Sequence, residues 1–216
     1  MDGTTLNIIQ TTNFPQDGRI DIAVNPEKDK KFKLKIRIPG WSEEEAIPGN
    51  LYMFNKPLKE KVSFSLNGKP ISPERDNGYA IIINKWKKGD IVHFELPMDV
   101  RILTADPRVT QDNERVAIQR GPFVYCAEWP DNFNNQVLDL KFDTSAVYSA
   151  ISDTMLNGVT IIKTKAAAVK RKQDGQLEMT ENLDATLIPY YAWANRGHGE
   201  MMVWLPISLN TVKPLP

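Results

Sequence analysis

Alternation of apolar and polar residues with a period of two constrains this chain more than any other feature of its sequence. At 32–38, Phe, Leu, Ile and Ile alternate with Lys, Lys and Arg. The same period recurs at 20–24, 62–66 and 92–96. Successive side chains of a β-strand point to opposite faces of its sheet, so this period predicts half-buried strands, the first with a basic outer face.

Turn signals separate the alternating segments. Asn67-Gly68 directly follows one of them and predicts a hairpin, because both residues accept a positive φ. Asn77-Gly78 and the run at 87–90 predict two further turns. Residues 145–155 suit one short helical turn, and 166–172 are assigned to a strand. Further strands are expected at 116–119, 123–127, 159–163, 187–194 and 201–205.

We therefore predict an all-β fold of two tandem antiparallel β-sandwich lobes, jelly-roll-like in character. Prolines and a polar run interrupt the strand pattern at 99–113, which places the lobes at 1–103 and 104–216. One continuous sandwich is the alternative. A chain of 216 residues is long enough for one large core or two small ones.

Charge and hydropathy exclude several classes of partner. The 27 basic and 27 acidic residues cancel, so we expect neither a nucleic acid nor an anionic membrane as a partner. No segment approaches the roughly 20 apolar residues of a membrane span. The N-terminus has neither the basic nor the apolar region of a signal peptide. Its early start in strand-like sequence suits a chain cut at a domain boundary.

The residues that carry nucleophilic chemistry are few and scattered. His93 occupies an outward position of a strand, and His198 lies in a polar turn. Cys126 lies in an apolar strand without a basic neighbour that would lower its pKa, so we interpret it as a core residue. One cysteine can form neither an internal disulfide nor a multi-thiolate zinc site. We predict no catalytic residue, no metal ligand and no cofactor on this chain.

A glycosidase needs two carboxylates about 5–10 Å apart. Glu128 and Asp131 flank Trp129 and form the acidic pair most worth testing. The simpler interpretation of the pair is a capped loop. Trp41, Trp86 and Trp129 lie near strand ends or in loops, so we name them as candidate contacts with a glycan or with a neighbouring domain. Trp193 and Trp204 are expected within apolar strands.

Six blocks, in order and over nearly the whole chain, resemble the C-terminal part of glycoside hydrolase family 127, a family of β-L-arabinofuranosidases once known as a domain of unknown function. The resemblance is more specific than any single motif. Its blocks are 32–41 (Phe-Lys-Leu-Lys-Ile-Arg-Ile-Pro-Gly-Trp), 62–70 (ending Leu-Asn-Gly-Lys-Pro), 78–90 (Gly-Tyr, then Trp-Lys-Lys-Gly-Asp), 96–101 (Leu-Pro-Met-Asp-Val-Arg), 115–126 (Arg-Val-Ala-Ile-Gln-Arg-Gly-Pro-Phe-Val-Tyr-Cys) and 188–197 (Ile-Pro-Tyr-Tyr-Ala-Trp-Ala-Asn-Arg-Gly).

The resemblance implies a parent enzyme with an N-terminal (α/α)6 barrel. In the family that barrel holds a cysteine nucleophile, a glutamate acid/base and a zinc ion bound by cysteines and a glutamate. This chain resembles only the β-sandwich lobes that follow the barrel, so no catalytic or zinc-binding residue is carried over. The resemblance further implies a periplasmic or secreted parent.

Two functions remain open for such a chain. It is either an accessory module that braces the barrel and contributes to a dimer, or a carbohydrate-binding module that recognises plant-type glycans through an exposed tryptophan. An autonomous enzyme is disfavoured. The stretch 42–61 is longer than a minimal turn, and we expect it to pack against the absent barrel or a second subunit. Tyr190, Tyr191 and Trp193 are expected as core or inter-lobe contacts.

Overall fold

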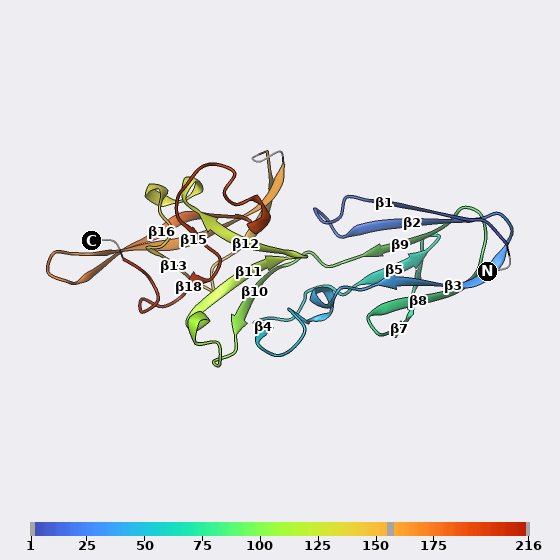
Figure 1. Ribbon diagram of the computed structural model, residues 1–216, viewed down its shortest axis with the longest axis horizontal. Helices are drawn as coiled ribbons and strands as arrows, with labels where there is room; N and C mark the ends of the chain where they lie inside the picture. Colours follow the sequence, from blue (N-terminus) through green and yellow to red (C-terminus); the bar gives the residue numbers. More distant parts are fainter. Residues whose placement is uncertain (1–2, 155–157, 215–216) are drawn as a thin grey trace. The chain divides into compact units, whose positions relative to one another are not determined.

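We describe a computed structural model of the chain, in which residues 3–154 and 158–214 are described (Figure 1). The strand pairings of this part of the chain are antiparallel, which confirms the all-β prediction. The chain forms two compact units, Met1–Pro48 with Pro57–Asp99 and Gly49–Lys56 with Val100–Pro216. The second unit thus begins at Val100, where we had drawn a boundary after residue 103, and it also takes a segment from the first half. Within the described residues, no helix is long and apolar enough to cross a membrane.

The first unit consists of two sheets. One has the strand order β1-β2-β9-β5-β6 and the other the order β3-β8-β7. The strands are β1 (Leu6–Thr12), β2 (Arg19–Pro26), β3 (Lys30–Arg37), β5 (Ser63–Leu66), β6 (Lys69–Ile71), β7 (Glu74–Asp76), β8 (Tyr79–Trp86) and β9 (Asp90–Glu95), with a 3-10 turn, η1 (Gly40–Glu43), after β3.

The core of the first unit lies between these two sheets. The alternating residues of β2 and β9 meet those of β3 and β8 in one buried cluster. Trp86 is the largest side chain there, stacked on Phe32 at 5.5 Å and donating its indole N–H to the Phe32 carbonyl at 3.1 Å. The period of two in the sequence therefore builds a sandwich in this unit.

Two Asn-Gly pairs close hairpins of the first unit. Asn67 and Gly68 have φ of 52° and 76° between β5 and β6. Asn77 and Gly78 have φ of 47° and 76° between β7 and β8. Positive φ at both central residues is the requirement of the tight turn that matches strand twist. Both predicted turns are confirmed.

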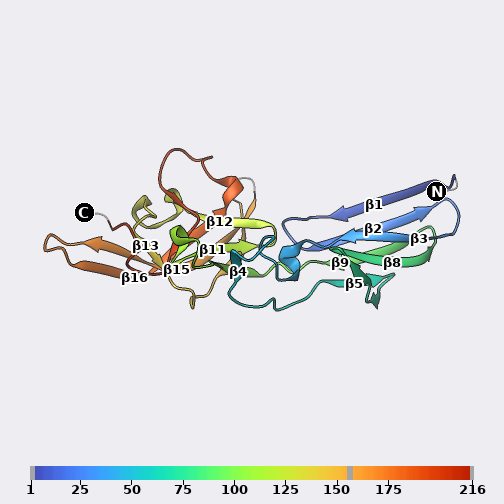
Figure 2. The same ribbon diagram turned by 60° about the horizontal axis from the view of Figure 1, so that its bottom comes forward.

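The strands of the second unit join in one sheet. Its main path is β13-β15-β16-β12-β11-β10-β4, and β14, β17 and β18 pair beside it (Figure 2). The strands are β4 (Tyr52–Phe54), β10 (Val100–Ala105), β11 (Arg115–Arg120), β12 (Phe123–Glu128), β13 (Leu140–Phe142), β14 (Ser149–Asp153), β15 (Val159–Arg171), β16 (Leu177–Pro189), β17 (Met201–Met202) and β18 (Leu205–Pro206), with the 3-10 turns η2 (Thr110–Asp112), η3 (Trp129–Asp131), η4 (Phe133–Asn135) and η6 (Tyr190–Ala192).

The C-terminal strands fill a gap in this sheet. β11 and β12 pair with each other only near their shared turn. Beyond that point β18 pairs with β11 and β17 pairs with β12, each along the edge that the hairpin leaves open. The main core below contains residues of β11, β12, β15 and β16 and buries Tyr125 and Phe142 almost completely.

Three local predictions differ from the structure. Within 145–155, where we expected a helical turn, residues 149–153 form strand β14 paired with β15; residue 155 lies outside the described residues. The strand expected at 187–194 ends at Pro189 and gives way to η6. Trp193 and Trp204 lie outside strands, because the chain turns at both places. The strand assigned at 166–172 is confirmed to Arg171 as part of β15.

Candidate functional site

An ion-pair cluster, which we call the Arg196 clamp, joins the end of β12 to the loop after η6. Arg196 Nη1 and Nη2 donate to the two oxygens of Asp131 at 2.7 and 2.5 Å. The same guanidinium donates to Glu128 Oε2 through Nε at 3.1 Å and also through Nη2. Glu128 Oε1 accepts the backbone N–H of Ala194 at 3.0 Å. The hydrogen bonds to Asp131 are the main reason that the pKa of Arg196 is raised.

Neighbouring groups hold the clamp in place from the side of η3. Asn132 donates to the carbonyls of Glu128 and Thr186 at 2.7 and 3.1 Å, and it accepts the Thr186 N–H at 3.0 Å. Glu200 Oε2 accepts the N–H groups of Val137 and Leu138. These bonds tie η3, β16, the segment after η4 and the loop before β17 together.

The clamp uses the acidic pair that the sequence analysis singled out. Glu128 has no exposed surface and shares one guanidinium with Asp131. A glycosidic acid/base pair must face the scissile bond from either side of a sugar. Both carboxylates face Arg196 instead, so the arrangement supports the capped-loop interpretation.

The remaining nucleophilic candidates belong to different elements of the fold. Cys126 is fully buried, and burial followed by the charge of Glu128 raises the pKa of its thiol to about 12. Such a thiol carries little thiolate at neutral pH. His93 Nδ1 lies 2.8 Å from Asp21 Oδ1 on the outer face of a first-unit sheet. His198 is exposed in the loop before β17. No group of three or more His, Cys, Asp or Glu with metal-binding spacing occurs among the described residues.

The three tryptophans named as contact candidates differ in exposure. Trp86 has no exposed surface and belongs to the first core. Trp41 is half-buried against the same core. Trp129 is half-buried over the close approach of Gly199, and its indole N–H has no hydrogen-bond partner in the described structure. The part of these three tryptophans in glycan or domain contacts stays a prediction.

An exposed group of rings at η6, which we call the aromatic surface, includes three residues that we had expected as core or inter-lobe contacts, and their exposure shows that the core assignment was wrong. It consists of Tyr190, Tyr191 and Trp193 together with Phe123 of β12. The first three are 47%, 54% and 40% exposed. Tyr190 and Trp193 lie 6.0 Å apart with planes 10° from parallel, and Tyr191 packs on Phe123 at 4.9 Å. The extended run ends at Pro189, and Ala194 in the following loop has a φ of 66° and donates its N–H to Glu128.

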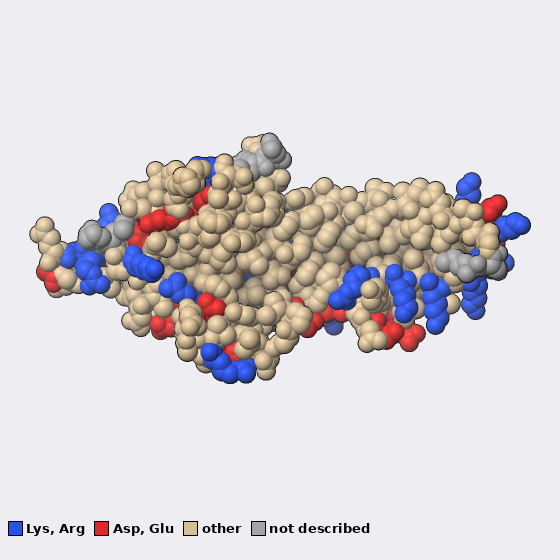
Figure 3. Space-filling view, in the orientation of Figure 1, with Lys and Arg blue, Asp and Glu red and all other residues tan. Residues whose placement is uncertain are grey.

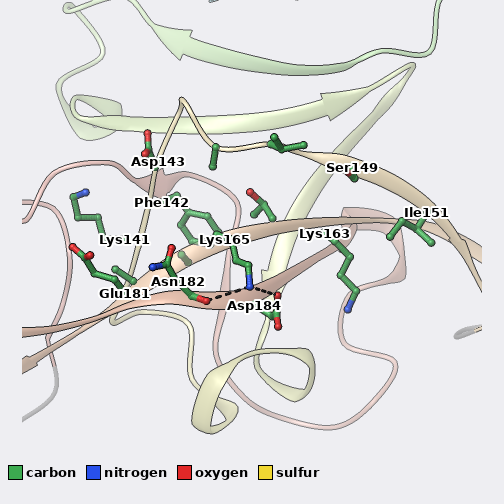
Figure 4. Close-up of a pocket in the computed structure, with 15 residues that line it drawn as sticks. Lys141, Phe142, Asp143, Ser149, Ile151, Lys163, Lys165, Glu181, Asn182 and Asp184 are labelled. Carbon is green, nitrogen blue, oxygen red and sulfur yellow. Dashed lines mark hydrogen bonds and ion pairs between the residues drawn. The ribbon is translucent and has the colours of Figure 1, made fainter.

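A groove of about 710 Å³ lies beside the β15–β16 hairpin (Figure 4). Lys165 donates to Asp184 at 2.7 Å and to the Asn182 carbonyl at 3.2 Å, and the hydrogen bond from Lys165 is the main reason that the pKa of Asp184 is lowered. Lys163 donates to Thr186 at 2.7 Å. The volume is that of a ligand site, but these cations are already engaged by neighbouring oxygens.

Two family models match the chain. Residues 1–98 match the β-L-arabinofuranosidase, glycoside hydrolase family 127 middle domain, and residues 100–206 match the glycoside hydrolase family 127 C-terminal domain. A curated relative is the non-reducing end β-L-arabinofuranosidase of Bifidobacterium longum subsp. longum. It is 30% identical over 215 residues, which are 92% of this chain and 30% of the relative.

Solved structures give the same result. A family 127 β-arabinofuranosidase superposes with a TM-score of 0.91 at 38% identity, over 100% of this chain and 34% of its own. A family 127 β-L-arabinofuranosidase from Geobacillus stearothermophilus superposes with a TM-score of 0.80 at 32% identity, over 95% of this chain and 31% of its own. The chain thus spans about a third of the length of these relatives.

Proposed function

Because the chain belongs to glycoside hydrolase family 127 as its middle and C-terminal domains, we propose that it acts as a non-catalytic accessory unit of a β-L-arabinofuranosidase. The relatives named above are β-arabinofuranosidases. Their remaining length, about two thirds of each chain, leaves room for a separate catalytic part. In this proposal the nucleophile, the acid/base and the zinc belong to that part.

The state of the reactive groups supports the non-catalytic role. The carboxylates of Glu128 and Asp131 are held by Arg196. The thiol of Cys126 lies in a core with a raised pKa. The two carboxylates are therefore occupied by a structural partner, and the buried thiol carries little thiolate at neutral pH.

The aromatic surface is the observation that carries the bracing role. Large rings left exposed on a rigid loop mark an interaction site, since Tyr and Trp are the residues most enriched at the centre of interfaces. The Arg196 clamp fixes the loop, so little conformational entropy is lost when a partner docks. The occupant we propose is the catalytic part of the same enzyme.

Activity measurements test the non-catalytic role. The chain alone is assayed with a chromogenic β-L-arabinofuranoside, and the catalytic region of the Bifidobacterium relative, produced separately, is assayed with and without the chain. We expect no turnover by the chain alone and an increase in the activity or half-life of the catalytic region when the chain is added. Turnover by the chain alone that is lost on the substitution Glu128→Gln would contradict the proposal.

A further inference from the structure

The outer face of the sheet β3-β8-β7 carries a row of cations that the bracing role does not use. Lys31, Lys33, Lys35 and Arg37 alternate along β3 with the residues that face the core. Alternate residues of a strand lie about 6.6 Å apart, so these four, which we call the basic row, extend over about 20 Å. Figure 3 shows blue Lys and Arg side chains spaced along one edge of the first unit.

The cations of the basic row are largely available. Lys31 and Lys33 have no hydrogen bond or ion pair with the described residues. Lys35 lies 4.0 Å from Asp76, with both side chains about half exposed, and such a pair contributes little. Arg37 donates to the carbonyls of Ile38 and Gly78, both at 2.6 Å, and its guanidinium lies 5.6 Å from the centre of the Tyr79 ring, which orders its side chain without an ion pair to a described residue.

The neighbouring strands restrict what can lie along this row. On β8, Ile83 stands opposite Lys33 and Tyr79 stands opposite Arg37, and both are exposed. On β7, Asp76 stands on the far side of Tyr79. A duplex or a membrane is wide enough to cover Asp76 as well as the cations. A single polyanionic chain that follows β3 meets the cations and the apolar strip, and it comes near Asp76 only at Lys35.

We propose that the basic row binds an acidic polysaccharide, whose sugar carboxylates pair with the ammonium groups of β3 and whose ring faces lie on Tyr79 and Ile83. The choice of a polysaccharide over a nucleic acid rests on the proposed function, in which the chain serves an enzyme that acts on glycans. The contacts are exposed, so salt screens them strongly.

The lysines of β3 could instead protect an edge strand from pairing, and this role predicts a different effect of charge reversal. β3 is an edge strand, and charged side chains on an edge strand prevent pairing with other chains. Glutamate protects an edge as well as lysine does. Charge reversal therefore keeps the protective role and abolishes the binding role.

The test is a calorimetric titration of the whole chain with oligogalacturonate at low salt, compared with the fully methyl-esterified, uncharged oligomer. The double variant K33E/K35E is compared with K59E/K61E, which makes the same change in net charge at exposed lysines elsewhere in the first unit. We expect K33E/K35E to weaken binding by about 2- to 30-fold, as the loss of two exposed ion pairs predicts, and K59E/K61E to bind like the parent chain.

Several outcomes overturn the proposal. These are no binding by the parent chain, equal binding of the uncharged oligomer, equal loss in both variants, or tighter binding of a single-stranded RNA. Substitution of the aromatic surface by Y191A/W193A should leave oligogalacturonate binding unchanged. A failure of the bracing role therefore remains distinguishable from a failure of this proposal.

Discussion

Arg196 compensates two carboxylates, one of which has no exposed surface. Removal of one member of such a cluster leaves a buried charge without its partner, whereas a neutral pair in its place costs far less. The stability of the loop that carries the aromatic surface therefore depends on this side chain.

We expect Arg196→Met to lower the free energy of unfolding by about 3 kcal/mol, and the double variant E128Q/R196M to regain part of that loss. The measurement is urea unfolding followed by tryptophan fluorescence. Arg108→Met is the matched control, since Arg108 pairs with Asp106 at 2.7 Å on the surface and should have little effect. Equal losses at both arginines would show that the clamp is no more important than a surface pair.

Asp139 is a second buried carboxyl group, and it lacks the arginine partner that Glu128 has. Its side chain is 1% exposed, and neither carboxylate oxygen has a hydrogen-bond partner in the described structure. Burial is the main cause of its raised pKa, with a smaller contribution from Glu200. The folded state therefore holds this proton more tightly than the unfolded state. Stability from this group is complete below the ordinary pKa of 3.8 and is lost as the pH rises through the raised value.

The substitution Asp139→Asn removes this titration. We expect the variant to be more stable than the parent chain at pH 7, with a difference that shrinks as the pH falls toward 4. Melting temperatures across this range measure the effect. A variant that is less stable than the parent at pH 7 would show that the carboxylate has a partner that Asn cannot replace.

At the scale of elements, the segment 49–56 is the part of the fold that the sequence analysis assigned differently. We expected 42–61 to contact the absent barrel or a second subunit, which stays a prediction, and the structure gives part of it a partner in this chain. Phe54 pairs with Leu103 where β4 joins β10, and the Arg101 guanidinium lies 3.4 Å from the centre of the Phe54 ring. Tyr52 stacks on Trp204 at 5.4 Å. The sheet of the C-terminal unit is thus extended by a strand from the first half.

Phe54→Ala should release β4 from this edge. We expect faster hydrogen exchange of amides in β4 and β10, no change in β3 and β8, and a stability loss of about 1–2 kcal/mol from the lost cation–π contact. Met53→Ala is the control, since Met53 is the exposed neighbour on the same strand. Exchange that rises equally in the first unit would contradict the assignment of β4 to the second.

Features whose interacting residues are close in sequence could be predicted, and those whose interacting residues are distant in sequence could not. The hairpins at Asn67 and Asn77 were predictable, since the turn residues and the alternating strands are adjacent in sequence. β4 has three residues and finds its partner about fifty residues away. The turn η6 interrupts an apolar run, and the bonds that hold its loop join Arg196 to Glu128, 68 positions earlier. A pattern of residue types does not contain such a pairing.

Over the whole molecule, the two units match two domains of one hydrolase family, and the role proposed for them is to support a catalytic part. The family assignment rests on matches that cover nearly the whole chain. The bracing role rests on the aromatic surface and on the clamp beneath it. The period of two predicted the all-β fold class. It did not predict the aromatic surface, because an exposed Tyr-Tyr-Ala-Trp run and a buried one have the same sequence.

The most direct test of the account is the affinity of the chain for the separately produced catalytic region of the Bifidobacterium relative, measured by sedimentation velocity. The account predicts a complex with the parent chain and a loss of at least about 2 kcal/mol of binding free energy for Y191A/W193A, as central aromatic contacts show. K33E/K35E should bind like the parent chain. A complex that forms equally well without the two rings, or no complex with the parent chain, would contradict the bracing role.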